Sequence, residues 1–168
     1  GNTWVEVQTD AEGENAMSIA IGSSGMVSTG FENSVIITSE DNGETFAEAM
    51  IDLGMSLDGA AAMTFNNDNI YVAINGEGVF QSQDGGQSWL RFGNGLSGRR
   101  FTSLKFDGEG NLYAGTESGG VFRNSVTANT WMEFNSGLEE ENIHSLSLMA
   151  DGRIAAAKDT REYENVGK

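Results

Sequence analysis

Apolar residues recur along this chain in short segments, separated by turns rich in glycine, asparagine and glutamate. Within several segments apolar side chains occupy every second position, as Leu104 and Phe106 do, and again Leu146 and Leu148. A period of two residues is typical of a β-strand that buries one face. The pattern therefore predicts an all-β chain made of short strands and tight turns.

The predicted strands form sets of four, which we name A, B, C and D in chain order. Three complete sets are predicted, at 16–22, 26–31, 35–39 and 45–50, at 60–65, 70–75, 79–83 and 88–92, and at 101–107, 112–117, 121–125 and 130–135. A fourth set has strands at 143–149, 154–159 and 162–166, and a separate strand of the D type is predicted at 3–7.

An eight-residue motif joins strands C and D in the first two sets. It is Ser-Glu-Asp-Asn-Gly-Glu-Thr-Phe at 39–46 and Ser-Gln-Asp-Gly-Gly-Gln-Ser-Trp at 82–89. Its closing aromatic residue recurs at Trp4, Phe46, Trp89 and Trp131, at intervals of 42, 43 and 42 residues. Strand-rich repeats of about this length are typical of β-propeller blades. We therefore predict a single β-propeller domain over 1–168, with blade repeats at about 8–50, 51–93, 94–135 and 136–168, the last completed by 3–7.

The motif itself has a structural interpretation. The glycine at its fifth position, Gly43 or Gly86, suits a hairpin turn that needs a positive φ. Its aspartate can accept hydrogen bonds from N–H groups of its own loop, and its aromatic side chain can bury a large apolar face. Calcium is not expected, because each loop offers one Asp at a ligand-like position. The residues predicted to hold the blades together are Ser39, Asp41, Gly43, Thr45, Phe46, Ser82, Asp84, Gly86, Ser88, Trp89, Trp131 and Trp4.

The strand at 3–7 matches the D strand that the fourth set lacks. It can complete that blade within one chain, which gives a four-bladed ring, or between chains, which gives an eight-bladed dimer or a larger assembly. In a third interpretation the chain is a slice of a longer propeller. Because the sequence opens within a repeat, we expect Gly1 to be a processing or cloning boundary.

Composition excludes several classes of partner and cofactor. A net charge of −16 and a sequence pI near 4.1 leave no basic patch for a nucleic-acid backbone. The chain has no cysteine, so it forms no disulfide, and it has no apolar run long enough for membrane insertion. His144 is the single histidine, and no zinc spacing, phosphate loop or dinucleotide motif is present. We therefore expect no metal and no cofactor.

The segments 39–46 and 82–89 resemble the Asp-box, or BNR repeat, of sialidases, xyloglucan-type glycosidases, sortilin-like receptors and photosystem II assembly-factor propellers. The segments 94–96, 119–122 and 136–138 also resemble the repeats of exported bacterial propellers. The resemblance implies a bacterial β-propeller that is secreted, on the cell surface or periplasmic. It further implies that ligands meet the face built by the D–A and B–C loops, away from the Asp-boxes, and it specifies fold more than function.

Charged residues in those loops are the candidates for binding a ligand: Arg99, Arg100, Glu139, Glu140, Glu141, Asp58, Glu117 and Arg161. Three arginines resemble the carboxylate-binding arginines of sialidases, but the chain has no proline and therefore no Arg-Ile-Pro segment. Its tyrosines all fall in predicted strands, so we assign no catalytic residue. The run 139–141 could supply the paired carboxylates of glycoside hydrolysis, although a solvated acidic loop is the simpler interpretation.

We therefore expect a non-catalytic recognition or scaffold module that binds a protein or a glycan. One alternative is a fragment of a BNR-type glycoside hydrolase with catalytic residues elsewhere, which predicts an aromatic-lined cleft and a buried carboxylate pair. The other is a structural subunit that forms a homo-oligomer by strand exchange through 3–7, which predicts that deleting residues 1–7 dissolves the oligomer. Ligand identity and ring size stay open at this point.

Overall fold

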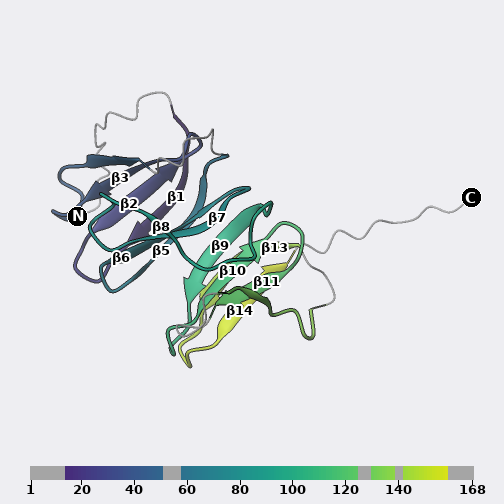
Figure 1. Cartoon of the computed structure of the whole chain (residues 1–168). Coiled ribbons are helices and arrows are strands. Elements are labelled where there is room, and N and C mark those ends of the chain that lie inside the picture. The colour runs from purple at the N-terminus through teal and green to yellow at the C-terminus, as the bar shows by residue number, and fades with distance from the viewer. Residues whose placement is uncertain (1–13, 51–57, 125–129, 139–141, 159–168) are drawn as a thin grey trace, which may run out of the picture.

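The computed structural model describes residues 14–50, 58–124, 130–138 and 142–158. This part of the chain consists of antiparallel strands and turns (Figure 1), which confirms the all-β prediction. No helix within it is long and apolar enough to cross a membrane.

Each sheet is a meander in which every strand pairs with the next one, and we call the sheets blades 1 to 4 in chain order. Blade 1 contains β1 (Ala16–Ile21), β2 (Val27–Phe31), β3 (Val35–Ser39) and β4 (Ala47–Met50). Blade 2 contains β5 (Ala60–Asn66), β6 (Asn69–Ile74), β7 (Gly78–Ser82) and β8 (Leu90–Arg91). Blade 3 contains β9 (Phe101–Phe106), β10 (Leu112–Thr116), β11 (Val121–Asn124) and β12 (Met132–Glu133), and blade 4 contains β13 (Ile143–Leu148) and β14 (Ile154–Lys158). The strands predicted at 3–7 and 162–166 lie outside the described residues.

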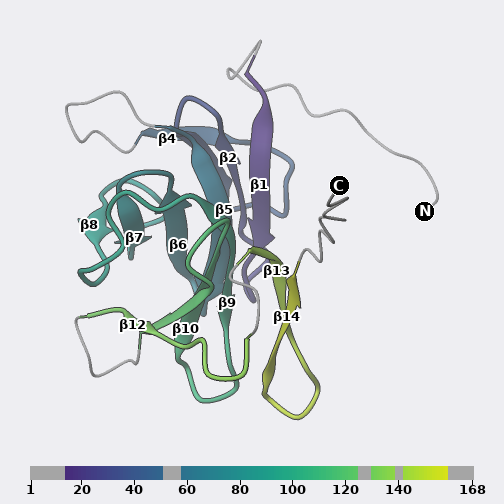
Figure 2. The same cartoon turned by 90° about the vertical axis from the view of Figure 1, so that its right-hand side faces the viewer.

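The first strands of the four blades form a row at the centre of the molecule (Figure 2). In this row β1 packs against β5, β5 against β9, and β9 against β13. The strands at its two ends, β1 and β13, make no contact of comparable extent with each other in the described part of the chain. The four blades therefore form an open arc as far as the structure describes them.

The outer strands β8 and β12 are shorter than the predicted strands at 88–92 and 130–135. The backbone explains the late start of β12. The Trp131 N–H donates to the carbonyl of Asn94 in the preceding loop (3.0 Å), and Thr130 forms a parallel bridge with Asn94. One N–H donates to one of these partners, so the Trp131 N–H serves the loop that follows blade 2 and not β11.

Apolar side chains fill the spaces between successive blades. Ile36 of β3 packs with Ile70 and Phe80 of blade 2, and all three are almost fully buried. Between blades 2 and 3, Trp131 lies in a cluster with Phe122 of its own blade and with Phe92, which follows β8. The core is thus divided into layers, each shared by two adjacent blades.

The closest approach between blades occurs at glycine. A Cβ placed on Gly115 of β10 would lie 2.8 Å from Cγ2 of Ile143 in blade 4 and 2.6 Å from Oγ of Ser103. At the matching position of blade 1, a Cβ on Gly30 would lie 2.5 Å from Cβ of Ala60 in blade 2. The missing side chain lets these second strands approach the first strand of the next blade.

Candidate functional site

The two Asp-boxes adopt the same hydrogen-bonded loop. Asp84 accepts hydrogen bonds from Ser82 Oγ (2.8 Å), Ser88 N (2.9 Å) and Ser88 Oγ (2.5 Å), and Ser82 Oγ accepts one from Gly86 N (2.8 Å). The loop at 39–46 repeats every one of these contacts with its own Ser, Asp, Gly and Thr. All these partners lie within the loop itself, so the aspartates are engaged in its structure.

Hydrogen bonds from the hydroxyl and N–H of Ser88 lower the pKa of Asp84 from 3.8 to about 2. The corresponding bonds from Thr45 lower the pKa of Asp41 to about 2 as well. Burial raises the pKa of Asp107, in the turn between β9 and β10, but hydrogen bonds from Asn111 and Glu109 outweigh this and leave it lowered. These carboxyl groups are therefore held in the ionised form, which suits structural anchors and not a general acid.

The opposite edge of the blades carries the D–A and B–C loops, and the structure joins these loops by backbone hydrogen bonds. Gly76 N donates to Arg99 O (2.8 Å), and Gly98 N donates back to Gly76 O (2.7 Å). In blade 3, Glu117 N donates to Arg100 O (3.1 Å). Residues from three connections are thus fixed side by side, and we call this surface the loop face.

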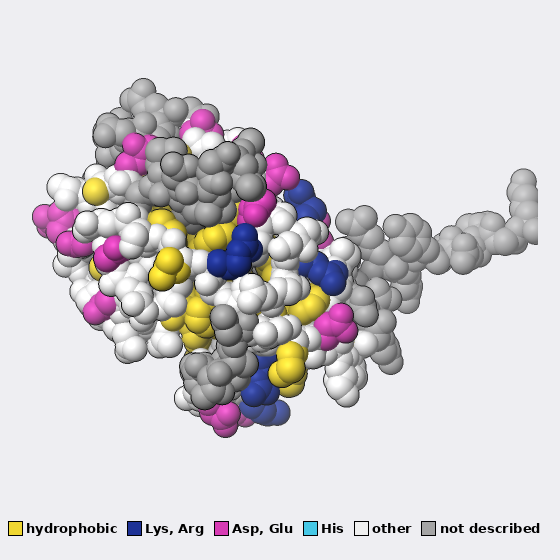
Figure 3. Space-filling model, in the orientation of Figure 1, with side chains coloured by type: hydrophobic (Ala, Val, Ile, Leu, Met, Phe, Trp, Pro, Cys, Tyr) yellow, Lys and Arg dark blue, Asp and Glu magenta, His cyan; other side chains and the backbone are white. Residues whose placement is uncertain are grey.

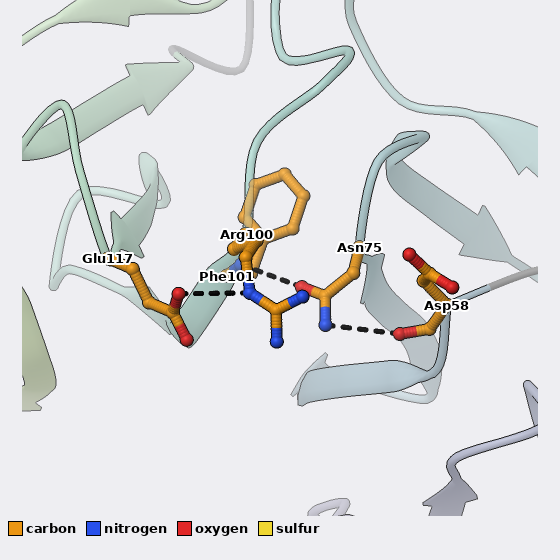
Figure 4. A network of polar contacts seen from close by, with 5 residues as sticks. All are labelled: Asp58, Asn75, Arg100, Phe101 and Glu117. Atoms are coloured by element: carbon orange, nitrogen blue, oxygen red, sulfur yellow. Dashed lines mark hydrogen bonds and ion pairs between the residues drawn. The ribbon is translucent and has the colours of Figure 1, made fainter.

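Asn75 is the polar residue at the centre of the loop face. It is buried at the end of β6, where its Nδ2 donates to Asp58 O (3.1 Å) and its Oδ1 accepts from Phe101 N (2.8 Å) (Figure 4). One side chain therefore links the start of blade 2 to the start of blade 3. Asn75 is not among the residues predicted from the sequence, since those are charged, although an amide between an apolar strand and Gly76 is a usable signal.

The structure brings Arg100 and Glu117 together. Arg100 Nε donates to Glu117 Oε2 (2.9 Å), and both side chains are exposed. Figure 4 shows the two groups facing each other beside the Asn75 link. An exposed pair of this kind contributes little to stability, about 0–1 kcal/mol, so its charges are available to a ligand.

Arg99 is engaged within the protein. Its Nη1 donates to Ser118 O (3.1 Å), and its guanidinium lies 5.0 Å from the ring centroid of Phe122. This stacking braces the B–C loop of blade 3. Arg91, which sequence analysis did not select, is placed similarly, 4.9 Å from the Phe80 ring and bonded to the carbonyl of Glu77.

The remaining candidates divide into two groups. Asp58 is exposed on the loop face, where its backbone carbonyl receives the bond from Asn75. Glu139, Glu140, Glu141 and Arg161 lie outside the described residues. Within the described ranges, no group of three or more His, Cys, Asp or Glu side chains could hold a metal ion.

Charge is distributed unevenly over the surface. In the view of Figure 3, Lys and Arg side chains lie over the middle and lower parts of the molecule, whereas Asp and Glu side chains are more frequent toward the left. Since the whole chain carries a net charge of −16, these basic side chains stand out against an acidic background.

No family model matches this sequence, and no curated protein matches it either. Several solved structures are similar to this chain. A GH74 enzyme of Niastella koreensis superposes with a TM-score of 0.68 at 16% identity, over 84% of this chain and 26% of that one. YCF48 bound to D1 peptide superposes with a TM-score of 0.67 at 15% identity, over 90% of this chain and 48% of that one. The extracellular domain of BT4673 from B. thetaiotaomicron superposes with a TM-score of 0.69 at 15% identity, over 85% of this chain and 20% of that one.

The chain has a β-propeller fold. At these identities the similarity shows the fold alone, and this propeller spans between a fifth and a half of the length of these three chains. Among these neighbours are an enzyme, a protein solved with a bound peptide and an extracellular domain, so the same architecture carries different activities.

Proposed function

We propose that this propeller is a non-catalytic recognition or scaffold module that binds a protein or a glycan on its loop face. The observation that supports this most directly is the exposed Arg100–Glu117 pair on a surface fixed by backbone bonds and by Asn75. A rigid surface with two opposite charges can exchange its internal ion pair for charges or hydroxyl groups of a ligand at little conformational cost. The solved complex of YCF48 with a peptide is consistent with a protein ligand for a propeller of this kind.

The test is a comparison of two arginine variants on arrays of immobilised peptides and glycans. Arg100→Ala removes a charge from the loop face, whereas Arg153→Ala removes one from the opposite edge, where Arg153 forms an equally exposed pair with Asp151 (2.7 Å). We expect array signals of the parent protein to fall about tenfold or more with Arg100→Ala and to persist with Arg153→Ala. Equal loss with both variants, or with neither, would contradict binding at this surface.

A second candidate is a segment of a polysaccharide-active enzyme, favoured by the likeness to the GH74 enzyme, of which this chain covers 26%. In that case the isolated chain would bind xyloglucan oligosaccharides without cleaving them. Incubation with these oligosaccharides, followed by mass analysis of the products and a binding titration, separates the two proposals. Binding to peptides alone would favour the recognition module.

Export from a bacterial cell is part of the proposal. The extracellular domain of BT4673 is among the structural neighbours, and the absence of cysteine means that an oxidising compartment would not alter the chain. Fractionation of the source cells, with antibody detection in medium, surface and periplasm, tests it, and detection in the cytoplasm alone would refute it.

A third candidate concerns assembly, in which residues 3–7 complete a blade of a second copy. It is favoured by the first strand of the arc, β1, whose Ile19 and Ile21 are strongly exposed. Light scattering on the full chain and on a chain lacking residues 1–7 tests it, because strand exchange predicts that the oligomer falls apart on deletion.

A further inference from the structure

A cavity lies between the first strands of the four blades. It has a volume of about 630 Å³, and its lining residues come from β1, β5, β9 and β13. Figure 2 shows these strands together in the middle of the molecule. The two ends of the arc, β1 and β13, therefore border one common space, which we call the axial pocket.

The axial pocket lies toward the edge that carries the Asp-boxes. Each first strand runs from a D–A loop to an A–B turn, and the lining residues come from the later part of each strand, at 19–21, 63–65, 105–106 and 147–148. In an antiparallel meander the A–B and C–D turns share one edge of the blade. The axial pocket is therefore a different place from the loop face.

Most of the lining is apolar. Ile19 and Ile21 are 67% and 70% exposed, and Leu148 is 46% exposed, whereas Met63 on the far wall is only 8% exposed. Exposed apolar side chains around a hollow are typical of ligand sites, and the volume lies within the range of about 300–1,000 Å³ for such pockets. The apolar side chains that line the pocket are Ile19, Ile21, Met63, Phe65, Phe106 and Leu148, besides Ala20.

The four blades differ at one position of this lining. The second-strand pairing places Ala20, Thr64, Lys105 and Ser147 at the same register position of their blades. Three of these side chains are uncharged. Among the described residues that line the axial pocket, Lys105 is thus the charged one.

Lys105 also differs from the arginines of the described chain. Each of those arginines contacts a carboxylate, a backbone carbonyl or an aromatic ring, as Arg100 contacts Glu117. The Lys105 ammonium, which is half-buried, has no such partner among the described residues. Because the whole chain carries a net charge of −16, an unpaired cation beside an apolar wall is a local feature that favours an anion.

We propose that the axial pocket binds a small amphiphilic anion, with one carboxylate and an aliphatic body of medium length. The Lys105 ammonium binds the carboxylate, and Ile19, Ile21 and Leu148 cover the aliphatic body, which removes apolar surface from water on both sides. The hydroxyl groups of Thr64 and Ser147 lie at the level of Lys105 and can donate to a carboxylate oxygen. This site is independent of the loop face and of the function proposed for it.

Calorimetric titration with octanoate and with 1-octanol tests the role of the charge. We expect Lys105→Met to weaken octanoate binding about tenfold or more, because the carboxylate loses its counterion, and to leave octanol binding unchanged. Lys158→Met is the matched control, since Lys158 is a half-buried lysine on β14 that does not line the pocket. Failure of octanoate to bind the parent protein, or equal octanoate affinity of the parent and Lys105→Met, would overturn the proposal.

A swap between blades separates a binding role of Lys105 from a structural one. Ser147 occupies the same register position in blade 4 and is exposed, so it can be exchanged with Lys105 at constant composition and charge. We expect Lys105→Ser alone to lose octanoate binding and the double variant Lys105→Ser with Ser147→Lys to regain it. A double variant that folds with the parent's melting temperature but does not bind would show that the two blades do not share one ligand.

The position of the ligand can be read from isotope-labelled methionine methyl groups. Met63 lines the axial pocket, whereas Met132 lies on the outer strand β12 and is 60% exposed. We expect octanoate to shift the methyl signal of Met63 and to leave that of Met132 in place. A shift of Met132 alone would put the ligand elsewhere and overturn the assignment.

A membrane surface also presents anionic groups above aliphatic chains. Sedimentation with phosphatidylglycerol vesicles distinguishes that source from a single dissolved molecule. We expect octanoate to bind and the protein to stay in the supernatant. Sedimentation with the vesicles that Lys105→Met abolishes, without octanoate binding, would overturn a pocket for single molecules.

Discussion

A single carboxylate organises each Asp-box loop. Asp84 accepts three hydrogen bonds from Ser82 and Ser88, and Ser82 in turn receives one from Gly86. Gly43 and Gly86, both at positive φ, let the loop turn tightly enough for these bonds to form. Because hydrogen bonds to the ionised form lower the pKa of Asp84 to about 2, the loop depends on ionisation of that residue.

The pH dependence of unfolding tests this at the residue scale. The pKa of Asp84 is 3.8 ordinarily and about 2 in the folded loop, so its contribution is complete above pH 3.8 and is lost as the pH falls through about 2. We expect Asp84→Asn to lower the melting temperature at pH 7. The difference in melting temperature between this variant and the parent protein should become smaller as the pH falls from 4 to 2. The exposed Asp68→Asn is the control. A difference in melting temperature that stays constant across this pH range would contradict the role of ionisation.

Local spacing explains why the loop residues were predictable and Asn75 was not. Each hydrogen bond of the loop, such as those of Asp84 with Ser82 and Ser88, joins residues at most four positions apart. The partners of Asn75, by contrast, are 17 and 26 residues away, at Asp58 and Phe101, and only the packing of blades brings them together. The stacking of Arg99 on Phe122 escaped prediction for the same reason.

At the scale of elements, the second strand of one blade approaches the first strand of the next, and side-chain size controls the approach. Gly115 in β10 leaves room for Ile143 of β13, which is fully buried. Periodicity predicted both strands, and the structure adds that they touch at this glycine. The start of β12 could not be predicted, because the bond of Trp131 N to Asn94 O depends on the neighbouring blade.

Gly115→Ala tests the close approach. Its Cβ would lie 2.8 Å from Ile143 Cγ2 and 2.6 Å from Ser103 Oγ, so these side chains or the backbone around them would have to shift. We expect a loss of about 1–3 kcal/mol in the free energy of unfolding, measured by urea denaturation. The double variant with Ile143→Ala should cost less than the sum of the two single variants by about 0.5 kcal/mol or more. Strict additivity would show that the two positions do not conflict.

At the scale of the whole molecule, acidity opposes compaction and association. Each chain carries a net charge of −16, so two copies repel each other before their blades meet. Salt reduces this repulsion, since the Debye length is about 10 Å at 0.1 M and about 3 Å at 1 M. Association of two copies is therefore expected to increase with ionic strength.

We expect added sodium chloride, from about 0.05 to 1 M, to increase the fraction of dimer seen by light scattering and to raise the melting temperature. An uncharged osmolyte at equal osmolality is the control for effects other than screening. A dimer fraction that falls with salt would mean that attraction between charges, and not apolar contact, holds the copies together.

Trp131 fixes the order in which the chain can become ordered during its synthesis. Its indole donates to Phe92, a residue 39 positions earlier, and so anchors blade 2 from the blade that follows. On a ribosome, blade 2 stays without this anchor until Trp131 has emerged, although its own strands are complete well before. Blade 2 therefore reaches its final packing one repeat late, and a translational pause just before residue 131 would prolong the exposure of Phe92.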